Sequence, residues 1–323
     1  MTHAVRIHAY GGPEALQWEP VEVPEPGPTE VRLRHTAVGL NFIDVYERTG
    51  LYPMALPGIP GREAAGVIEA VGERVKGLSV GDRVAYTSGS AGAYSEARVM
   101  SADRLVRIPE GIDDRTAAAM MLKGLTVQAL LRQIYRVRKN DFIVLHAAAG
   151  GVGLIAVQWA KHLGANVIAI VGSEEKAAMV RERRADHVLL QSEDWRARVK
   201  QITNGQGAHV VYDSVGKDTF MTSLDCVRPR GLMVTFGNAS GPVPPIAPLE
   251  LSKRGSLFLT RPTLFHYIAT RPALTKAAQE LFDLVARSVI EVHVGQTYPL
   301  RDVARAHRDL EARQTTGSTV LLP

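Results

Sequence analysis

A glycine-rich turn is the sharpest chemical motif in the sequence. It runs from His146 to Gly153, between a strand-like stretch and an apolar helical pattern. Gly150 would let the backbone approach a pyrophosphate, Gly153 would let the helix pack closely on its strand, and the free N–H groups at the helix start would bind the phosphates. Ala148 stands where the dinucleotide-binding fingerprint has its first glycine. The strand before the turn and the helix after it favour a dinucleotide site over a glycine turn without a ligand.

The next strand-like stretch, 166–171, bears on which dinucleotide binds. Gly172 and Ser173 follow it, and Lys176 comes one turn into the next helix. A site for NAD places a carboxylate at this strand tip to bind the ribose 2′-hydroxyl. A hydroxyl, open backbone N–H groups and an ammonium suit a 2′-phosphate instead, which favours NADPH. Two alternatives stay open: one of the two glutamates before Lys176 turns toward the ribose, or Lys176 is only a solvated helix lysine.

Alternating strands and helices must position this site. Strand-like runs are expected at 142–146, 166–171, 186–190, 209–213 and 232–236, with a sixth at 256–260. A long apolar helical stretch at 117–135 precedes them. Strands separated by helices pair in parallel through right-handed crossovers. The sequence therefore predicts an α/β protein with a doubly wound parallel sheet.

The flanking regions have a different pattern. Short β-type runs at 4–7, 30–37, 66–71 and 82–86 are separated by Gly and Pro, which predicts a β-rich domain. The proline-rich stretch 19–28 suits a connection or an edge strand. After the sheet, helices at 274–288 and 302–312 and strands at 292–294 and 318–322 are expected to return to the β-rich domain.

Length and composition limit the class of protein. The 323 residues exceed the size at which a single core usually stops growing, so two domains are expected. The start of the chain is unlike a signal peptide and no apolar run reaches membrane-spanning length, so a cytoplasmic protein is expected. Cys226 is the only cysteine, which excludes an internal disulfide and a zinc site of several thiolates. The net charge of +5 suits an anionic cofactor, and it is also compatible with a nucleic-acid binder.

Further motifs spread along the whole chain carry a family resemblance. They are Asn41-Phe42-Ile43-Asp44, Gly50-Leu51-Tyr52-Pro53, Gly61-Arg62-Glu63-Ala64-Ala65-Gly66, Gly81-Asp82-Arg83-Val84, Leu122-Lys123-Gly124-Leu125-Thr126, Tyr212-Asp213-Ser214-Val215-Gly216, Phe236-Gly237-Asn238 and Thr260-Arg261-Pro262. With the glycine-rich turn, these motifs resemble the quinone oxidoreductases of the zeta-crystallin-like branch of the medium-chain dehydrogenase/reductase superfamily.

The resemblance implies the architecture and the reaction. It implies a GroES-like catalytic domain from residues 1–125 and 265–323, a Rossmann domain from 126–264, a cleft between them, and a homodimer. The implied reaction is hydride transfer from NADPH to a quinone. Zinc-dependent relatives carry Gly-His-Glu at the position of Gly61-Arg62-Glu63, and an arginine cannot ligate a cation, so the resemblance is to the zinc-independent branch.

The resemblance also assigns cofactor contacts, residue by residue. Those beside the nicotinamide begin with Phe42 and Ile43, and the 2′-phosphate is expected at Gly172, Ser173 and Lys176. Many members have a tyrosine near this phosphate where Gln191 stands here, which leaves the preference for NADPH over NADH open. The remaining contacts are Thr126, Ala129, Gly150, Gly151, Val152, Gly153, Val215, Phe236, Gly237, Asn238, Ser240, Leu259, Arg261 and Arg313.

Catalysis without zinc needs hydrogen-bond donors for the negative charge on the acceptor oxygen. The resemblance places five donors around the pocket: Tyr52, which we rank first, Tyr46, Asn41, Lys123 and Arg261. Either tyrosine could instead only pack against the nicotinamide or the pocket wall. Asp44 is expected to orient a donor or a water, or to cap a loop, and Glu63 is expected to be structural.

Two other functions stay open at this point. The first is a reductase of α,β-unsaturated carbonyls or enoyl thioesters, which uses the same cofactor and hydride step. The second is single-stranded nucleic-acid binding through the basic cleft, which would weaken steeply with salt and compete with NADPH.

Overall fold

Six parallel strands form a sheet from the middle of the chain. The computed structural model describes all 323 residues. The strand order is β10-β9-β8-β11-β12-β13, and every pair is parallel. The strands are β8 (Phe142–His146), β9 (Asn166–Val171), β10 (His187–Leu190), β11 (Ala208–Asp213), β12 (Val227–Thr235) and β13 (Phe258–Thr260). The order reverses between β8 and β11, as in a doubly wound sheet, so the predicted fold class is confirmed.

Helices separate these strands, and their sequences explain where they begin. α3 (Gly151–His162) follows β8, and α4 (Glu174–Glu182) follows β9. Ser173 is the N-cap residue of α4, and its side chain accepts from Lys176 N. Asp194 is the N-cap residue of α5 (Trp195–Ile202), and its side chain accepts from Ala197 N. The others are α6 (Phe220–Cys226), α7 (Leu249–Lys253) and α8 (Leu264–Tyr267).

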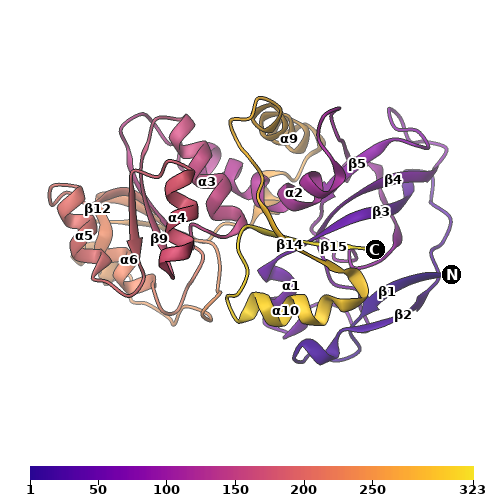
Figure 1. Ribbon diagram of the computed structural model, residues 1–323, viewed down its shortest axis with the longest axis horizontal. Helices are drawn as coiled ribbons and strands as arrows, with labels where there is room; N and C mark the ends of the chain where they lie inside the picture. Colours follow the sequence, from indigo (N-terminus) through magenta and orange to yellow (C-terminus); the bar gives the residue numbers. More distant parts are fainter. The chain divides into compact units, whose positions relative to one another are not determined.

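A second sheet combines strands from the first third of the chain with the last two strands (Figure 1). Its strand order is β14-β15-β3-β4-β5-β7, and β6 pairs with β3. The strands are β3 (Glu30–Leu40), β4 (Glu63–Val71), β5 (Arg83–Thr87), β6 (Ala97–Ser101), β7 (Val106–Arg107), β14 (Val294–Pro299) and β15 (Ser318–Leu322). β15 pairs antiparallel with β3, with Leu321 opposite Val38, so the last strand belongs to the same sheet as the N-terminal part. β1 (Thr2–Arg6) and β2 (Gln17–Val21) form a separate hairpin.

Four helices accompany this sheet: α1 (Phe42–Arg48), α2 (Asp114–Gln128), α9 (Arg271–Ala286) and α10 (Val303–Glu311). The helix expected at 117–135 begins earlier, because the Asp113 carboxylate accepts from Thr116 N at 2.8 Å. It ends at Gln128 and continues as a π-helical segment, Ala129–Ile134. The strand expected at 292–294 was wrong, since β14 begins at Val294 and runs to Pro299. Proline at its end is tolerated because β14 is the edge strand of the sheet.

The chain separates into two compact units. The first contains residues 1–125, 268–286 and 292–323, and the second contains 126–267 and 287–291. Each has its own apolar core, with Leu33, Tyr86 and Leu105 among the core residues of the first and Ile168, Val211 and Met233 among those of the second. No helix is both long enough and apolar enough to cross a membrane.

Candidate functional site

A buried carboxylate joins two of the predicted donors in the first unit. Glu63, the first residue of β4, is 0 % exposed. Its Oε1 accepts from Asn41 Nδ2 at 2.8 Å and from Lys123 Nζ at 2.6 Å, and its Oε2 accepts from Leu122 N at 2.6 Å. Glu63 was expected to be structural, and its carboxylate lies between two of the predicted donors. An acidic residue followed by two alanines and a glycine was the available signal.

The neighbouring strand leaves room for this carboxylate. Gly39 of β3 pairs with Glu63 in the sheet register. A Cβ atom at Gly39 would lie 2.3 Å from Glu63 Oε1 and 2.4 Å from Ala118 O. A side chain at this position would therefore displace the carboxylate that holds the donors.

Three aromatic rings form a row that starts on α1. Phe42 and Tyr46 are four residues apart and lie on one helix face, with ring centroids 6.1 Å apart. Tyr52 packs edge-on against Tyr46 at 5.2 Å, and its backbone N donates to Tyr46 O at 3.0 Å. The two tyrosines predicted as donors are thus brought together. The choice between a donating and a packing role stays a prediction.

Asp44 lies in the first turn of α1 and is 0 % exposed. Its Oδ2 accepts from Asn41 N at 2.9 Å and from the Tyr94 hydroxyl at 2.8 Å, whereas its buried Oδ1 has no partner. Burial, with the nearby Glu47 charge, raises the pKa of Asp44 to about 8. These contacts describe a group that caps the start of α1, which is one of the two roles left open by the sequence.

Arg62 stands where zinc-dependent relatives are expected to carry a ligand. Its Nε donates to the buried Glu47 carboxylate at 2.6 Å, and its Nη1 donates to Ser88 O at 3.3 Å. Burial raises the pKa of Glu47, and the Arg62 guanidinium opposes this shift. A guanidinium is a permanent cation with no free lone pair, so the side chains at this position do not fit a zinc ion.

The glycine-rich turn of the second unit has the geometry of a phosphate site. Gly150 is the N-cap of α3 and provides no side chain for its first N–H groups, which have no partners within a helix. Ala147, at the tip of β8, has a left-handed φ of 50°. A Cβ atom at Gly153 would lie 2.5 Å from Ala148 Cα and 2.6 Å from Ala147 O, so only glycine allows this approach of helix to strand. These residues fit a pyrophosphate.

The residues predicted for the 2′-phosphate gather at the tip of β9. An added Cβ at Gly172 would meet nothing within 4 Å. Ser173 Oγ accepts from Lys176 N at 3.3 Å, so the hydroxyl keeps its own hydrogen for another partner. Gln191 is exposed, and its backbone N donates to Val171 O at 2.8 Å, which holds it beside this tip. The first glutamate of α4 pairs with Arg181 of the same helix, and the alternative that one of the two glutamates turns toward the ribose stays open.

A second buried carboxylate, missed by the sequence reasoning, organises the end of β11. Asp213 is 0 % exposed. Its Oδ1 accepts from Val215 N at 2.8 Å and Gly216 N at 3.0 Å. Its Oδ2 accepts from Thr219 Oγ1 at 2.7 Å and Ser223 Oγ at 2.9 Å. The carboxylate therefore fixes the loop that contains the predicted cofactor contact Val215.

The same network reaches the glycine-rich turn. Ser223 Oγ lies 2.9 Å from Nε2 of His146, the last residue of β8. Because Ser223 donates to Asp213, it accepts here, and His146 Nε2 carries the hydrogen. Burial lowers the pKa of His146, and its Nδ1 has no partner. One carboxylate thus supports both the loop after β11 and the residue that leads into the turn.

Arg261 follows β13 and braces the loop after β12. Its Nη1 donates to Gly237 O at 2.9 Å and to Thr235 Oγ1 at 3.1 Å. With the Asn238 amide oriented so that its oxygen faces the guanidinium, Nη2 donates to that oxygen at 3.1 Å. Arg261 was predicted as a donor and as a cofactor contact. These bonds connect it to Gly237 and Asn238, which are also predicted contacts, and its own role stays a prediction.

The predicted residues divide between the two units. Ala129 is only 2 % exposed, and Leu259 lies on β13. Arg313 follows α10 with a left-handed φ of 60°. The first unit holds Asn41, Phe42, Ile43, Asp44, Tyr46, Tyr52, Lys123 and Arg313, and the second unit holds all the others.

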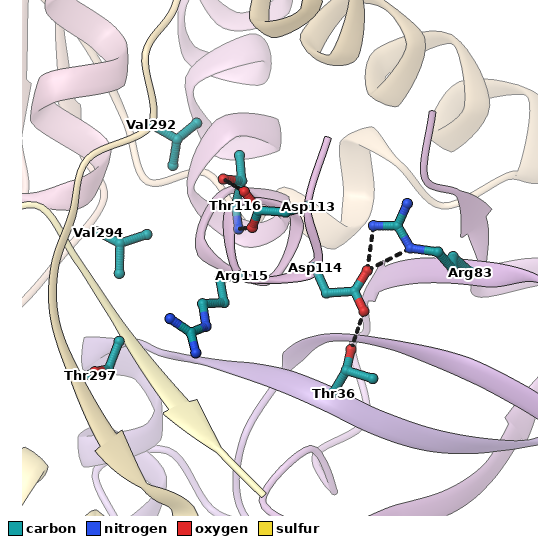
Figure 2. Close-up of a pocket in the computed structure, with 9 residues that line it drawn as sticks. All are labelled: Thr36, Arg83, Asp113, Asp114, Arg115, Thr116, Val292, Val294 and Thr297. Carbon is teal, nitrogen blue, oxygen red and sulfur yellow. Dashed lines mark hydrogen bonds and ion pairs between the residues drawn. The ribbon is translucent and has the colours of Figure 1, made fainter. Parts of the chain in front are cut away.

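A pocket of about 850 Å³ lies elsewhere in the first unit (Figure 2). Arg83 donates to Asp114 through two nitrogens, and Thr36 donates to the same carboxylate at 2.7 Å. These polar groups are therefore engaged with one another around the start of α2. The lining residues are Thr36, Arg83, Asp113, Asp114, Arg115, Thr116, Val292, Val294 and Thr297, and none of them is a predicted site residue.

Known proteins match this chain from end to end. Residues 27–110 match the alcohol dehydrogenase GroES-like domain, and residues 151–287 match the family described as zinc-binding dehydrogenase. A quinone oxidoreductase of Pseudomonas aeruginosa is 54 % identical over 327 residues, which cover 100 % of both chains. A 2-haloacrylate reductase of Burkholderia sp is 46 % identical over 331 residues, covering 100 % of this chain and 99 % of that protein.

Solved structures agree with the sequence matches. The crystal structure of Escherichia coli quinone oxidoreductase complexed with NADPH superimposes with a TM-score of 0.98 and 47 % identity, covering 100 % of both chains. Likeness at this level shows that the chain belongs to the quinone oxidoreductase family of the medium-chain dehydrogenase/reductase superfamily.

Proposed function

We propose that this chain is a zinc-independent, NADPH-dependent quinone oxidoreductase. The observation that carries the proposal is the buried Glu63 carboxylate, which holds the amide of Asn41 and the ammonium of Lys123 on one oxygen. Each of these groups keeps at least one further hydrogen for another acceptor. Two fixed donors suit an oxygen that gains negative charge when a carbonyl compound accepts a hydride. Relatives named quinone oxidoreductases support this choice of acceptor.

The second unit supports the choice of cofactor. The N-terminus of α3 would bind the pyrophosphate through backbone N–H groups, with Gly153 holding the helix against its strand. Ser173 and Lys176 would bind the 2′-phosphate, and open space at Gly172 leaves room for it. Bound NADPH would supply the hydride. Both the P. aeruginosa relative and the structure complexed with NADPH are matched over their whole length.

In this proposal the chain's residues orient the quinone and stabilise the product charge. Asn41 and Lys123 donate to the quinone oxygen, and Glu63 fixes their direction. Tyr52 and Tyr46 form an aromatic pair in the same unit. Each either donates to the acceptor oxygen or packs against the pocket wall. Arg62 cannot replace a zinc ligand and pairs with Glu47, so no step is assigned to a metal.

The second candidate is a reductase of α,β-unsaturated carbonyl compounds. It is favoured by the 46 % identity to a protein named 2-haloacrylate reductase. Hydride addition to such a compound also moves negative charge to a carbonyl oxygen, so the same donors would serve. The two functions differ in substrate and not in the residues invoked.

A substrate panel tests the proposal. Small quinones, alkenals, 2-haloacrylates and enoyl thioesters are assayed with NADPH and with NADH in parallel. We expect the highest kcat/KM with quinones and NADPH, and activity that survives exhaustive chelation. Turnover of haloacrylates or thioesters alone would refute the quinone assignment, and loss of activity on chelation would refute the zinc-independent mechanism.

A charge reversal tests the phosphate contact. Lys176→Glu should raise the KM for NADPH far more than the KM for NADH, because only NADPH carries the 2′-phosphate. Equal effects on both would remove Lys176 from this role. A labelled single-stranded oligonucleotide, titrated at rising salt with and without NADPH, tests the nucleic-acid alternative in the same preparation.

We also propose a homodimer that forms through β13. This strand is at the edge of its sheet, and Phe258 on it is 63 % exposed. Leu249 of α7 is 59 % exposed. An apolar edge strand is a ready surface for pairing with a second copy. Light scattering after gel filtration should give twice the chain mass, and Phe258→Lys should give the monomer mass.

A further inference from the structure

α1 ends in a buried arginine that binds two other segments of the first unit. Arg48 is the last residue of α1 and is 1 % exposed. Its Nη1 and Nη2 donate to the two oxygens of Glu311 at 2.9 and 2.8 Å, and its Nε donates to Gly11 O at 3.1 Å. Nη1 also lies 3.1 Å from His307 Nδ1. Glu311 and His307 both belong to α10, which lies alongside α1 in Figure 1.

The guanidinium fixes the hydrogen positions of a chain of buried groups. A guanidinium only donates, so Nδ1 of His307 accepts and its Nε2 carries the hydrogen. Nε2 lies 3.0 Å from the Tyr94 oxygen and donates to it. The Tyr94 hydrogen is then directed to Asp44 Oδ2, at 2.8 Å. The hydrogen bonds therefore run from Arg48 at the end of α1, through His307 of α10 and then Tyr94, to Asp44 in the first turn of α1.

His307 and Tyr94 keep one hydrogen arrangement over the physiological pH range. His307 and Tyr94 are both 0 % exposed. Burial and the Arg48 charge lower the pKa of His307 to about 3, so the imidazole stays neutral. Burial, with Asp44 and Glu47 nearby, raises the pKa of Tyr94 well above its usual value, so the phenol keeps its proton. The hydrogens on His307 Nε2 and on the Tyr94 hydroxyl thus each point to a single acceptor.

The two helices joined in this way hold predicted cofactor contacts. Phe42 and Tyr46 lie on α1, and Arg313 comes two residues after Glu311, just past the end of α10. We propose that Arg48, with His307 and Tyr94, is a positioning group that sets the spacing between the α1 contacts and Arg313, and so sets cofactor affinity. This inference rests on the proposed function, because it takes these residues as cofactor contacts.

A purely stabilising role explains the arrangement less well. Burying a charged pair costs desolvation free energy, and apolar side chains of similar volume often stabilise a fold as well or better. A forked arginine adds fixed geometry that apolar packing lacks. The expected function of such a group is therefore to hold one relative position of two helices.

The test measures cofactor binding directly. Arg48→Lys keeps the charge but loses the fork. Fluorescence titration should give dissociation constants for NADPH and for NADH that are both raised roughly tenfold, as for lost supporting contacts around other sites. The factors should be equal, because the change alters position and leaves the 2′-phosphate contacts untouched. kcat with a saturating quinone should fall by less than the affinity does.

Arg83→Lys is the matched control. Arg83 also pairs with a carboxylate in the first unit, where two of its nitrogens donate to one oxygen of Asp114 (Figure 2). Its side chain is 40 % exposed, so Arg83→Lys should cost less stability than Arg48→Lys, and it should leave both dissociation constants unchanged. If Arg48→Lys does not fold, Glu311→Gln is used, since its side chain is 35 % exposed and the change removes the charge and one of the two acceptor oxygens. Glu311→Gln should raise the dissociation constants for NADPH and for NADH by the same factor, and this factor should be smaller than for Arg48→Lys.

The outcomes separate this inference from the proposed function. Unchanged dissociation constants in the folded Arg48 or Glu311 variant, or equal changes in the Arg83 control, would overturn the positioning role. A wild-type protein that binds neither nucleotide would overturn the proposed function instead.

Discussion

Each unit buries one aspartate next to predicted cofactor contacts, but the two carboxylates have different partners. Asp213 in the second unit accepts four hydrogen bonds, two on each oxygen. Asp44 in the first unit accepts two, both on Oδ2, and its buried Oδ1 has none. Burial without enough donors disfavours the charged form, and the pKa of Asp44 is raised to about 8. The two buried aspartates therefore differ in the number of hydrogen-bond donors around them, and not in burial.

The difference has a structural origin. Asp213 ends a parallel strand, where the backbone N–H groups of the following loop and the hydroxyls of α6 converge. Asp44 lies within a short helix, where its neighbours include two further buried acids, Glu47 and Glu63. The second unit therefore uses its aspartate to fix a loop, whereas the first unit uses its aspartate to begin a helix, which makes its stability depend on pH.

The largest expected effect is that of Asp213→Ala. The change leaves two backbone N–H groups and two hydroxyls without their acceptor in a buried site, which should cost on the order of 4 kcal/mol of unfolding free energy. Denaturant titration followed by tryptophan fluorescence measures it, because Trp159 and Trp195 both lie in this unit. A cost below about 1 kcal/mol would mean that the four bonds do not act as described.

Asp44→Asn should change the pH dependence of stability. The folded protein keeps a proton on Asp44 up to about pH 8, whereas the unfolded chain loses it near pH 3.8. Between these pH values the folded state binds more protons, so this group lowers the stability of the wild type as pH rises. The variant lacks this contribution, so its stability relative to the wild type should increase from pH 4 to pH 8.

The measurement is a series of denaturant titrations of both proteins across this range. His35 and His307, whose pKa values burial lowers to about 3, give the opposite slope at acid pH, but they are present in both proteins and cancel in the difference. A difference that stays constant from pH 4 to pH 8 would show that Asp44 is not protonated in the folded state.

Tyr94→Phe should have a smaller effect on stability and should sharpen the comparison. It removes one of the two donors to Asp44 and leaves the hydrogen on His307 Nε2 without an acceptor, at a cost of about 2 kcal/mol. Because the Tyr94 hydrogen bond lowers the pKa of Asp44, its loss should extend the pH-dependent range to higher pH. Thermal unfolding at several pH values measures both effects, and an unshifted range would contradict the second.

Ser223→Ala should have the smallest effect. Asp213 keeps three donors, and only His146 Nε2 loses its partner, so the expected cost is about 1 kcal/mol. The loss of one donor in four should be tolerated better than the loss of one in two at Asp44. A Ser223→Ala cost larger than that of Tyr94→Phe, in matched denaturant titrations, would reverse the comparison.

Local patterns predicted much of this molecule. Apolar runs and glycines give the parallel strands and the turn at Gly150, because these depend on neighbours along the chain. The start of β12 at Val227 was not predicted, since Pro229 and Gly231 interrupt the run. The partners of buried acids depend on sheet register and helix packing over long separations. Asn41 and Lys123 lie 22 and 60 residues from Glu63, and Arg48 lies 263 residues from Glu311.

The pairing of β15 with β3 affects how the chain folds during synthesis. β3 emerges from the ribosome early, but its partner β15 emerges only after the whole second unit. The strands of the second unit lie between them in the sequence and can pair while translation continues. The first unit is therefore completed after the second, and until β15 emerges one side of β3 at residues 38–40 stays open to chaperones or to a neighbouring nascent chain.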